Sequence, residues 1–123
     1  MPKTILVVED NDIHGGMVKD LLEMKGYQVL WAQSGTETFS VLENERPDLI
    51  LMDMQLPDFT GEEVTMRIKA DESLSAIPIV AVTAFASKDD ENTMRNAGCC
   101  GFVSKPFEFA DFFKTLESVL GEG

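Results

Sequence analysis

The amino-acid sequence predicts an α/β fold, a doubly wound (βα)5 sheet of five parallel strands. Two observations lead to this class. Five short apolar runs alternate along the chain with longer segments in which apolar residues recur at helical spacing. The runs carry few polar residues, which is typical of strands that helices cover on both faces of a parallel sheet. A chain of 123 residues fits one such domain.

The first strand and the first helix are predicted within residues 4–25. The run TILVV at 4–8 is apolar and β-branched, which favours a buried strand. The following helix is expected to run to Lys25, because Gly26 supplies a stop signal. Glycines at positions 15 and 16 interrupt it, each costing about 1 kcal/mol relative to alanine. Its apolar residues at helical spacing are Ile13, Met17, Leu21 and Met24.

The second strand is expected at 27–32, in the run YQVLWA. Ser34 is expected to cap the next helix, because a serine side chain can accept from the free backbone N–H groups of a first turn. This helix should extend toward Glu45. It carries three apolar residues: Phe39, Val41 and Leu42.

The third strand is the apolar run 49–52, which brings Asp53 to its carboxyl end. The pattern breaks at residues 56–58 and resumes as a helix at 62–70. The residues expected on the inner face of this helix are Val64, Met66 and Ile68.

The last part of the chain predicts two more strands and two more helices. A strand is expected at 79–82, followed by a helix that starts near Ser87 and stops at Ala97. A very short strand at 101–103 precedes the last helix. That helix has an apolar stripe within an arc of about 120°. The stripe contains Phe109, Phe112, Phe113, Leu116, Val119 and Leu120.

Composition excludes several classes of function. The formal charge is −12, from 22 acidic and 10 basic residues, and would repel a nucleic-acid backbone. No apolar run approaches the roughly 18 residues of a membrane span, and the start of the chain does not resemble a signal peptide, so we expect a cytoplasmic protein without membrane insertion. Cys99 and Cys100 are adjacent and rarely bridge, which predicts buried reduced thiols.

Polar residues follow four of the predicted strands, and a parallel sheet brings these ends to one edge. They are Glu9, Asp10, Asp53, Thr83 and Lys105. Each alone is as well explained by capping, a turn or a solvated side chain. Three carboxylates together repel one another unless a cation neutralises them, and an all-oxygen set suits hydrated Mg²⁺. An ionised Asp53 could then attack phosphorus, with Thr83 and Lys105 stabilising the phosphoryl oxygens.

Four motifs in this order resemble the receiver domain of two-component response regulators. They are Glu9-Asp10-Asn11, Leu51-Met52-Asp53-Met54 with Leu56-Pro57 and Gly61, Ala81-Val82-Thr83-Ala84, and Ser104-Lys105-Pro106. The resemblance implies a flavodoxin-like, CheY-like sheet with strand order 2-1-3-4-5. It covers nearly the whole chain and implies a single receiver domain at 1–123 without an effector domain. Within the family, the nearest likeness is to the stand-alone cell-cycle regulators of the DivK type.

The resemblance also implies a role for each site residue. Asp53 would accept a phosphoryl group from a phosphohistidine of a histidine kinase or phosphotransferase. Mg²⁺ would bind Asp10, Asp53 and the Met54 carbonyl, with Glu9 helping through water. Thr83 and Lys105 would contact the phosphoryl group.

The implied output is protein binding rather than catalysis. Phosphorylation would alter the face made by the fourth helix, fifth strand and fifth helix. Thr83 and Phe102 would act as the switch pair, and Phe102 lacks the hydroxyl of the tyrosine that is commoner there. Lys105-Pro106 would be the family's cis peptide. Such a protein assists its own phosphorylation and dephosphorylation only, and is not otherwise an enzyme.

Two other functions share parts of this pattern. A haloacid-dehalogenase-like phosphatase also uses an aspartate nucleophile and Mg²⁺, but it needs a second acid two residues later, where this chain has Gln55. A flavodoxin-like FMN carrier needs a hydroxyl- or glycine-rich anion loop after the first strand, and residues 9–12 are acidic instead.

Some residues outside the four motifs allow both a structural and a functional interpretation. His14 is expected to be an exposed helix residue rather than a phosphodonor. Gly15 and Gly16 are ascribed to local tolerance, ahead of close approach by a phosphotransfer helix. Phe107 and Phe113 are candidates for a partner surface.

Overall fold

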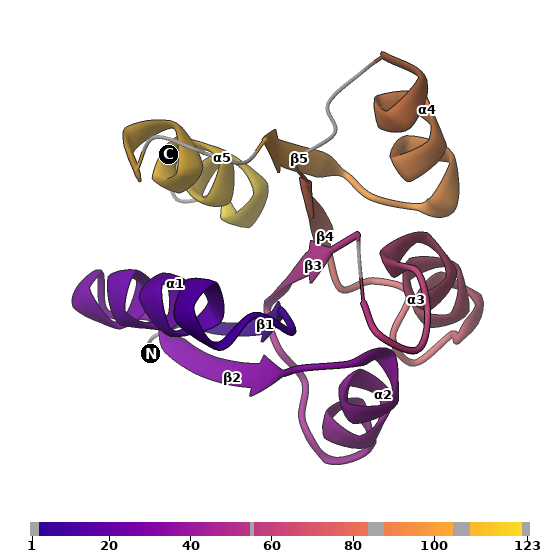
Figure 1. Cartoon of the computed structure of the whole chain (residues 1–123), viewed down its shortest axis with the longest axis horizontal. Coiled ribbons are helices and arrows are strands. Elements are labelled where there is room, and N and C mark those ends of the chain that lie inside the picture. The colour runs from indigo at the N-terminus through magenta and orange to yellow at the C-terminus, as the bar shows by residue number, and fades with distance from the viewer. Residues whose placement is uncertain (1–2, 55, 84–87, 105–108, 122–123) are drawn as a thin grey trace.

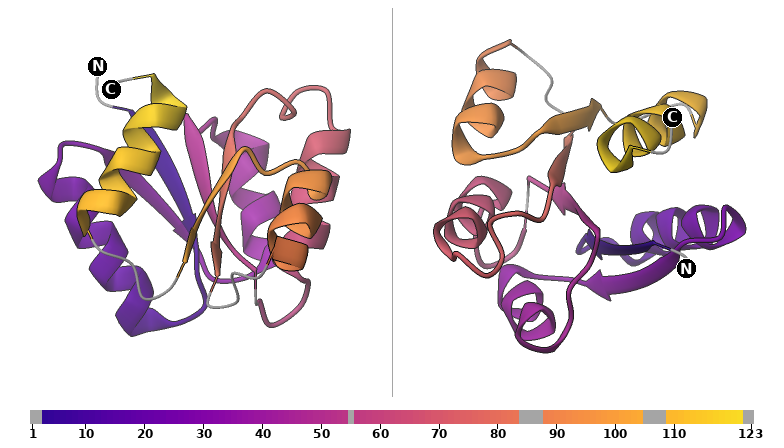
Figure 2. Two further views of the ribbon diagram at one scale, coloured as in Figure 1. Left: turned by 90° about the horizontal axis from the view of Figure 1, so that it is seen from above. Right: turned by 180° about the vertical axis from the view of Figure 1, so that it is seen from behind.

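Five parallel strands form one central sheet in a computed structural model that describes residues 3–54, 56–83, 88–104 and 109–121. The strand order is β2-β1-β3-β4-β5, which confirms the predicted topology. The arrowheads all lie at the same edge of the sheet in the left view of Figure 2. The strands are β1 (Thr4–Val8), β2 (Gln28–Ala32), β3 (Leu49–Asp53), β4 (Ile79–Thr83) and β5 (Gly101–Ser104).

Five helices cover the sheet on both faces. Two of them, α1 and α5, lie on one face, and α2, α3 and α4 lie on the other (Figure 1). All five predicted helices are present, and each helix end that the sequence predicts lies within one or two residues of the observed end. The helices are α1 (Asp12–Met24), α2 (Gly35–Asn44), α3 (Gly61–Ala70), α4 (Lys88–Ala97) and α5 (Phe109–Leu120). The described residues contain no helix that is both long and apolar enough to cross a membrane.

The alternation of side chains along each strand divides the core into two clusters. In β1, Ile5 and Val7 join the cluster that includes Phe112 of α5, whereas Leu6 and Val8 join the cluster that includes Val64 of α3. Both faces of β3 and β4 are buried along their whole length. This double burial explains why their sequences are uninterrupted apolar runs rather than alternating ones.

The face that α1 turns to the sheet differs from the stripe named from the sequence. Ile13 and Met24 are 87% and 82% exposed, and Met17 is 41% exposed. The buried residues of the helix are instead Gly15, Val18 and Leu22. Two apolar stripes were available, and the one with Gly15 lies inward because a residue without a side chain lets the helix approach β2 closely.

Three smaller expectations about burial were also wrong. Met66 and Phe109 are exposed on α3 and α5, because each lies beside rather than within the buried stripe of its helix. Cys99 is buried, but Cys100, just before β5, is exposed, and both are free thiols as predicted. Phe113 is half-buried under the Lys25 ammonium, which weakens its candidacy for a partner surface.

Candidate functional site

The register of the sheet brings three carboxylates together at its carboxyl edge. Val8 of β1 pairs with Met52 of β3, so the next residue on each strand, Glu9 and Asp53, lies side by side. Oxygen atoms of Glu9, Asp10 and Asp53 all lie within 4.8 Å of one another. Glu9 is 3% exposed and Asp53 is 6% exposed, whereas Asp10 is exposed. The structure therefore brings together the three acids that the sequence places at strand ends.

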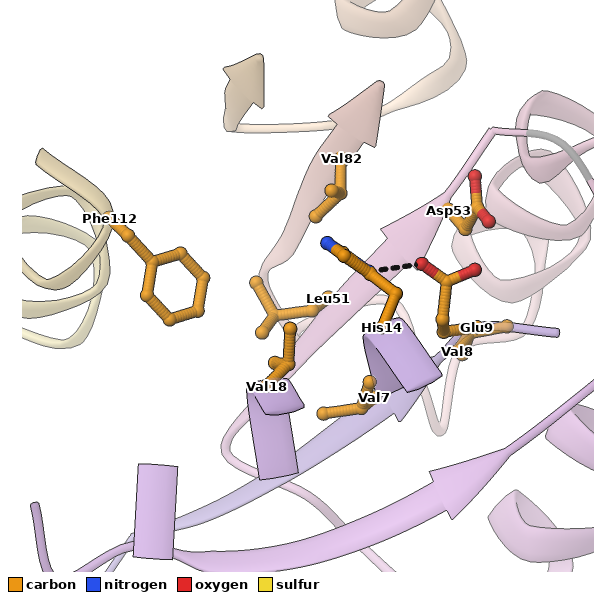
Figure 3. A pocket seen from close by; sticks show the side chains of 9 residues that line it. All are labelled: Val7, Val8, Glu9, His14, Val18, Leu51, Asp53, Val82 and Phe112. Carbon is orange, nitrogen blue, oxygen red and sulfur yellow. Dashed lines mark hydrogen bonds and ion pairs between the residues drawn. The ribbon is translucent and has the colours of Figure 1, made fainter. Parts of the chain in front are cut away.

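Glu9 is held by hydrogen bonds from several elements. Its backbone N–H donates to the Ala32 carbonyl at 2.9 Å, and its own carbonyl accepts from the Trp31 indole N–H at 2.9 Å. Its carboxylate oxygen Oε1 lies 2.6 Å from Nδ1 of His14 (Figure 3). Because β2 and α1 both contribute, the position of Glu9 depends on packing between elements.

His14 belongs to this site, and the expectation of an exposed helix residue was wrong. Its side chain is 24% exposed and lines a small cavity with Glu9 and Asp53 (Figure 3). The signal was present in the sequence: His14, Val18 and Leu22 are spaced by four residues, so the stripe that is buried in α1 also turns His14 to the sheet.

Gly15 has a packing role that the sequence did not reveal. A Cβ atom there would lie 2.3 Å from the Trp31 ring, whereas one at Gly16 would meet nothing within 4 Å. Trp31 is the residue whose indole holds the Glu9 carbonyl. The helix therefore merely tolerates a glycine at position 16, whereas Gly15 is needed to leave room for the Trp31 side chain.

Asp53 ends β3 and is followed by a tightly packed turn. The Met54 N–H donates to the Val82 carbonyl at 3.3 Å, and the Met54 carbonyl accepts from the Gly61 N–H at 3.1 Å. A Cβ atom on Gly61 would lie only 2.3 Å from the Asp53 carbonyl oxygen. The start of α3 thus packs directly on the backbone of the strand end.

Asp58 ties the loop after β3 to the start of α2. Its carboxylate accepts from the backbone N–H groups of Gly35 and Thr36, both at 2.9 Å, and from the Thr36 hydroxyl at 2.6 Å. The Thr36 hydroxyl bond, followed by the backbone bonds, holds the pKa of Asp58 well below its ordinary 3.8. We name this contact the Asp58 latch.

Thr83 and Phe102 lie on the other side of the edge. Thr83 is buried at the end of β4. It lines a groove of about 210 Å³ together with Met54, which follows β3, and with residues at the start of α3 and in α4. Asp53 lines a separate cavity of about 10 Å³ (Figure 3). Phe102 is half-buried, and the Arg95 guanidinium lies 5.5 Å from its ring centroid.

Some predicted residues lie outside the described part of the chain. These are Gln55, Lys105, Pro106 and Phe107, so the ammonium contact and the cis peptide stay predictions. Cys99 carries no reactive thiol: burial raises its pKa to about 11, so the thiolate is disfavoured.

Comparison with known proteins supplies an independent view of this arrangement. The profile of the response regulator receiver domain matches residues 5–117. The Polar-differentiation response regulator DivK of Brucella anthropi is 44% identical over 122 residues, which cover 99% of each chain. DivK of Brucella ovis has the same identity and coverage.

Solved structures show the same fold. The receiver domain of a sensor histidine kinase from Pseudomonas aeruginosa PAO1, with a magnesium ion coordinated in its active site cleft, superposes with a TM-score of 0.90 at 33% identity over 98% of this chain and 99% of that chain. The chemotaxis response regulator CheY4 of Vibrio cholerae gives a TM-score of 0.92 at 28% identity, covering 97% of this chain and 99% of that chain.

Proposed function

This chain belongs to the response regulator receiver domain family of two-component systems and is DivK-like, and we propose that it acts as a stand-alone phosphoacceptor in a phosphorelay. The DivK relatives are matched over 99% of their own length, which supports a regulator without an effector domain. A histidine kinase or a histidine phosphotransferase would supply the phosphoryl group, and protein binding would be the output.

The observation that carries the proposal is the clustering of Glu9, Asp10 and Asp53 within 4.8 Å. Two of these carboxylates are buried, and their mutual repulsion favours a bound cation. The donors are all oxygen atoms, which fits Mg²⁺ better than a softer metal. Asp10, Asp53 and the Met54 carbonyl would hold the ion, with Glu9 acting through water. Mg²⁺ would neutralise charge on the phosphoryl oxygens.

Asp53 would act as the nucleophile. One of its carboxylate oxygens attacks the phosphorus of the donor phosphohistidine, a P–O bond forms, and the P–N bond breaks. The imidazole leaves with its bonding electron pair and takes a proton from solvent. Thr83 and Lys105 would donate to the transferred phosphoryl oxygens.

The switch would lie at Thr83 and Phe102. Thr83 now lines the groove between α3 and α4, not the cavity that Asp53 lines. A phosphoryl group on Asp53 would draw the Thr83 hydroxyl toward it and change the packing beside Phe102. Because Phe102 has no hydroxyl, its contribution to the changed surface would be apolar.

The exposed stripe of α1 fits the approach of the phosphodonor. Ile13 and Met17 lie in the first turns of the helix and are 87% and 41% exposed. These turns start at the same edge of the sheet as Asp53 (Figure 2). Exposed apolar side chains at the same edge of the sheet as a reactive group favour a protein partner over a small substrate.

Phosphorylation by acetyl phosphate tests the proposal directly. We expect intact-mass spectrometry to detect one phosphoryl group when the protein is incubated with acetyl phosphate and Mg²⁺, and none with EDTA. Asp53→Asn should gain no phosphoryl group. Asp48→Asn is the matched control. Asp48 immediately precedes β3, at the end of the strand away from Asp53, and its carboxylate accepts a hydrogen bond from the Thr4 N–H. No gain in the wild type, or an equal gain in Asp53→Asn, would rule out the proposal.

Two further measurements would refine the function. Repeated hydrolysis of a phosphomonoester such as p-nitrophenyl phosphate should be absent, and many turnovers per protein would instead indicate a phosphatase. Phosphotransfer profiling against a panel of histidine kinases and phosphotransferases would identify the donor.

A further inference from the structure

His14 is a residue of this chain that contacts the acidic cluster without being one of the expected ligands. We propose that His14 is a positioning residue: it holds the Glu9 carboxylate in the orientation that favours Mg²⁺ over a larger cation. This inference rests on the proposed magnesium site and concerns how selective that site is.

The contact between His14 and Glu9 gives the two carboxylate oxygens of Glu9 different partners. His14 Nδ1 lies 2.6 Å from Glu9 Oε1, a short hydrogen bond (Figure 3). The proposed metal site requires an ionised Glu9, and an ionised carboxylate only accepts hydrogen bonds, so Nδ1 would carry the proton and donate it. The second oxygen, Oε2, accepts from the Asn11 N–H at 3.4 Å. His14 thereby makes the two oxygens of Glu9 inequivalent.

Two other contacts of Glu9 hold its backbone rather than its side chain. Its backbone is held on one side by the Ala32 carbonyl and on the other by the Trp31 indole, each at 2.9 Å. The bond to His14 therefore restrains the part of Glu9 that the backbone contacts do not reach. A buried carboxylate with fixed torsions presents its oxygens in one geometry.

Contacts within α1 and with the core fix the position of His14. It lies in the first turn of α1, where the Asn11 side chain accepts from its backbone N–H at 2.9 Å. Its side chain lines the cavity that Val18, Val82 and Phe112 also line (Figure 3). A group that orients a ligand residue is effective only when its own position is fixed in this way.

The choice of cation follows from the different demands of Mg²⁺ and Ca²⁺. Mg²⁺ requires near-ideal octahedral geometry at short distances, whereas Ca²⁺ accepts more ligands in flexible arrangements. A loosely held Glu9 carboxylate should therefore lower the affinity for Mg²⁺ more than the affinity for Ca²⁺. A purely electrostatic effect of the imidazole would act on both ions alike, because they carry the same charge.

Calorimetric titration of the full chain with MgCl₂ and with CaCl₂, at fixed ionic strength, tests the inference. Because Glu9 acts through water, His14→Ala should weaken Mg²⁺ binding by at most roughly 10-fold, the low end of the loss seen when the partner of a direct ligand is removed, and should weaken Ca²⁺ binding clearly less. His14→Asn should retain most of the Mg²⁺ affinity, because the asparagine amide N–H can take the place of Nδ1–H. Gly16→Ala, in the same turn, should leave both affinities unchanged because its Cβ meets nothing within 4 Å.

Further variants separate positioning from folding. Melting temperatures without metal show whether a variant is folded, and His14→Leu, which fills space without a donor, replaces His14→Ala if the latter unfolds. In a Glu9→Gln background, His14→Ala should no longer change the ratio of Mg²⁺ to Ca²⁺ affinity.

The possible results are distinguishable. A wild type that does not bind Mg²⁺ overturns the proposed metal site, and the role of His14 with it. A wild type that binds Mg²⁺, together with His14→Ala and His14→Leu variants whose Mg²⁺ to Ca²⁺ ratio is unchanged, keeps the site and overturns the inference.

Discussion

Around Glu9, side chains of neighbouring elements hold the carboxyl edge of the sheet by hydrogen bonds. The Phe102 side chain, by contrast, packs against the core and meets the Arg95 guanidinium above its ring. We call these two regions the acid side and the switch side. On the acid side, β2 and α1 donate to Glu9, and the Asp58 latch joins the loop after β3 to α2. On the switch side, the side-chain hydrogen bonds described for Thr93 and Arg95 stay within α4. The contact described between Arg95 and Phe102 is a cation–π contact of the guanidinium with the phenyl ring.

The difference suits the two tasks of the proposed function. A metal and a phosphoryl group need donors in fixed positions, and directional bonds between elements provide them. A switch needs two arrangements of similar free energy, and a groove of about 210 Å³ beside Thr83 leaves room for side chains to take a second arrangement. Variants on the acid side should therefore cost stability and metal affinity together, and variants on the switch side should cost little of either.

The largest effect is expected where the acid side has no room to adjust. Gly61→Ala would place a Cβ atom 2.3 Å from the Asp53 carbonyl oxygen, and a backbone atom cannot rotate away. We expect a loss of about 3 kcal/mol in the free energy of unfolding. Thermal denaturation should show this as a fall of about 10 °C in melting temperature.

Gly16→Ala is the matched control for that substitution. Its Cβ has open space, and alanine favours a helix by about 1 kcal/mol over glycine, so its melting temperature should rise. If both variants melted alike, the close packing of α3 on the end of β3 would not limit stability.

A smaller loss is expected for Gly15→Ala, because its Cβ would meet the Trp31 side chain, which can move. Moving the ring breaks its bond to the Glu9 carbonyl, so we expect a cost of about 1–2 kcal/mol. Trp31 is the only tryptophan, so its fluorescence should change with the substitution. In a Trp31→Leu background the same substitution should cost much less, and an equal cost would show that Trp31 is not the obstacle.

Removing the charge of the Asp58 latch should have an effect that depends on pH. The pKa of Asp58 in the folded protein is lowered below 3.8, chiefly by the Thr36 hydroxyl. The latch therefore stabilises the fold fully above that ordinary pKa, and its contribution is lost as pH falls from 3.8 toward the folded value. Asp58→Asn should melt below the wild type at pH 6–8, and the gap should narrow only below about pH 4. A gap that narrowed near neutral pH would contradict this assignment.

Within the acid side, the sequence predicts some residues and misses others. Asp53 and its neighbours Glu9 and Asp10 were placed correctly at one edge, because a parallel topology fixes which strand ends meet. His14 and Trp31 were missed as partners of Glu9. Their roles depend on which stripe of α1 faces the sheet, and two apolar stripes competed in the sequence.

Contacts through the backbone were the least predictable. Gly15 and Gly61 matter because of what a Cβ atom would meet, and that distance depends on how closely two elements pack. In the Asp58 latch, Asp58 is separated from Thr36 by 22 positions in the sequence and from Gly35 by 23, and no local sequence pattern predicts such a pairing. By contrast, Ser34 acts as the expected cap, because its bond to the Glu37 N–H is local.

The smallest effect on stability is expected for Arg95→Gln on the switch side. The guanidinium lies 5.5 Å from the Phe102 centroid at an exposed position, where such a contact contributes about 0.5–1 kcal/mol. Mg²⁺ affinity and the yield of acetyl phosphate labelling should match the wild type, because Arg95 lies outside the acidic cluster. The side-chain NMR signals of Phe102 should nevertheless shift, since the ring loses the cation above it. A fall in Mg²⁺ affinity in Arg95→Gln would show that the two sides are already coupled before phosphorylation, and that the switch side helps to hold the acids in place.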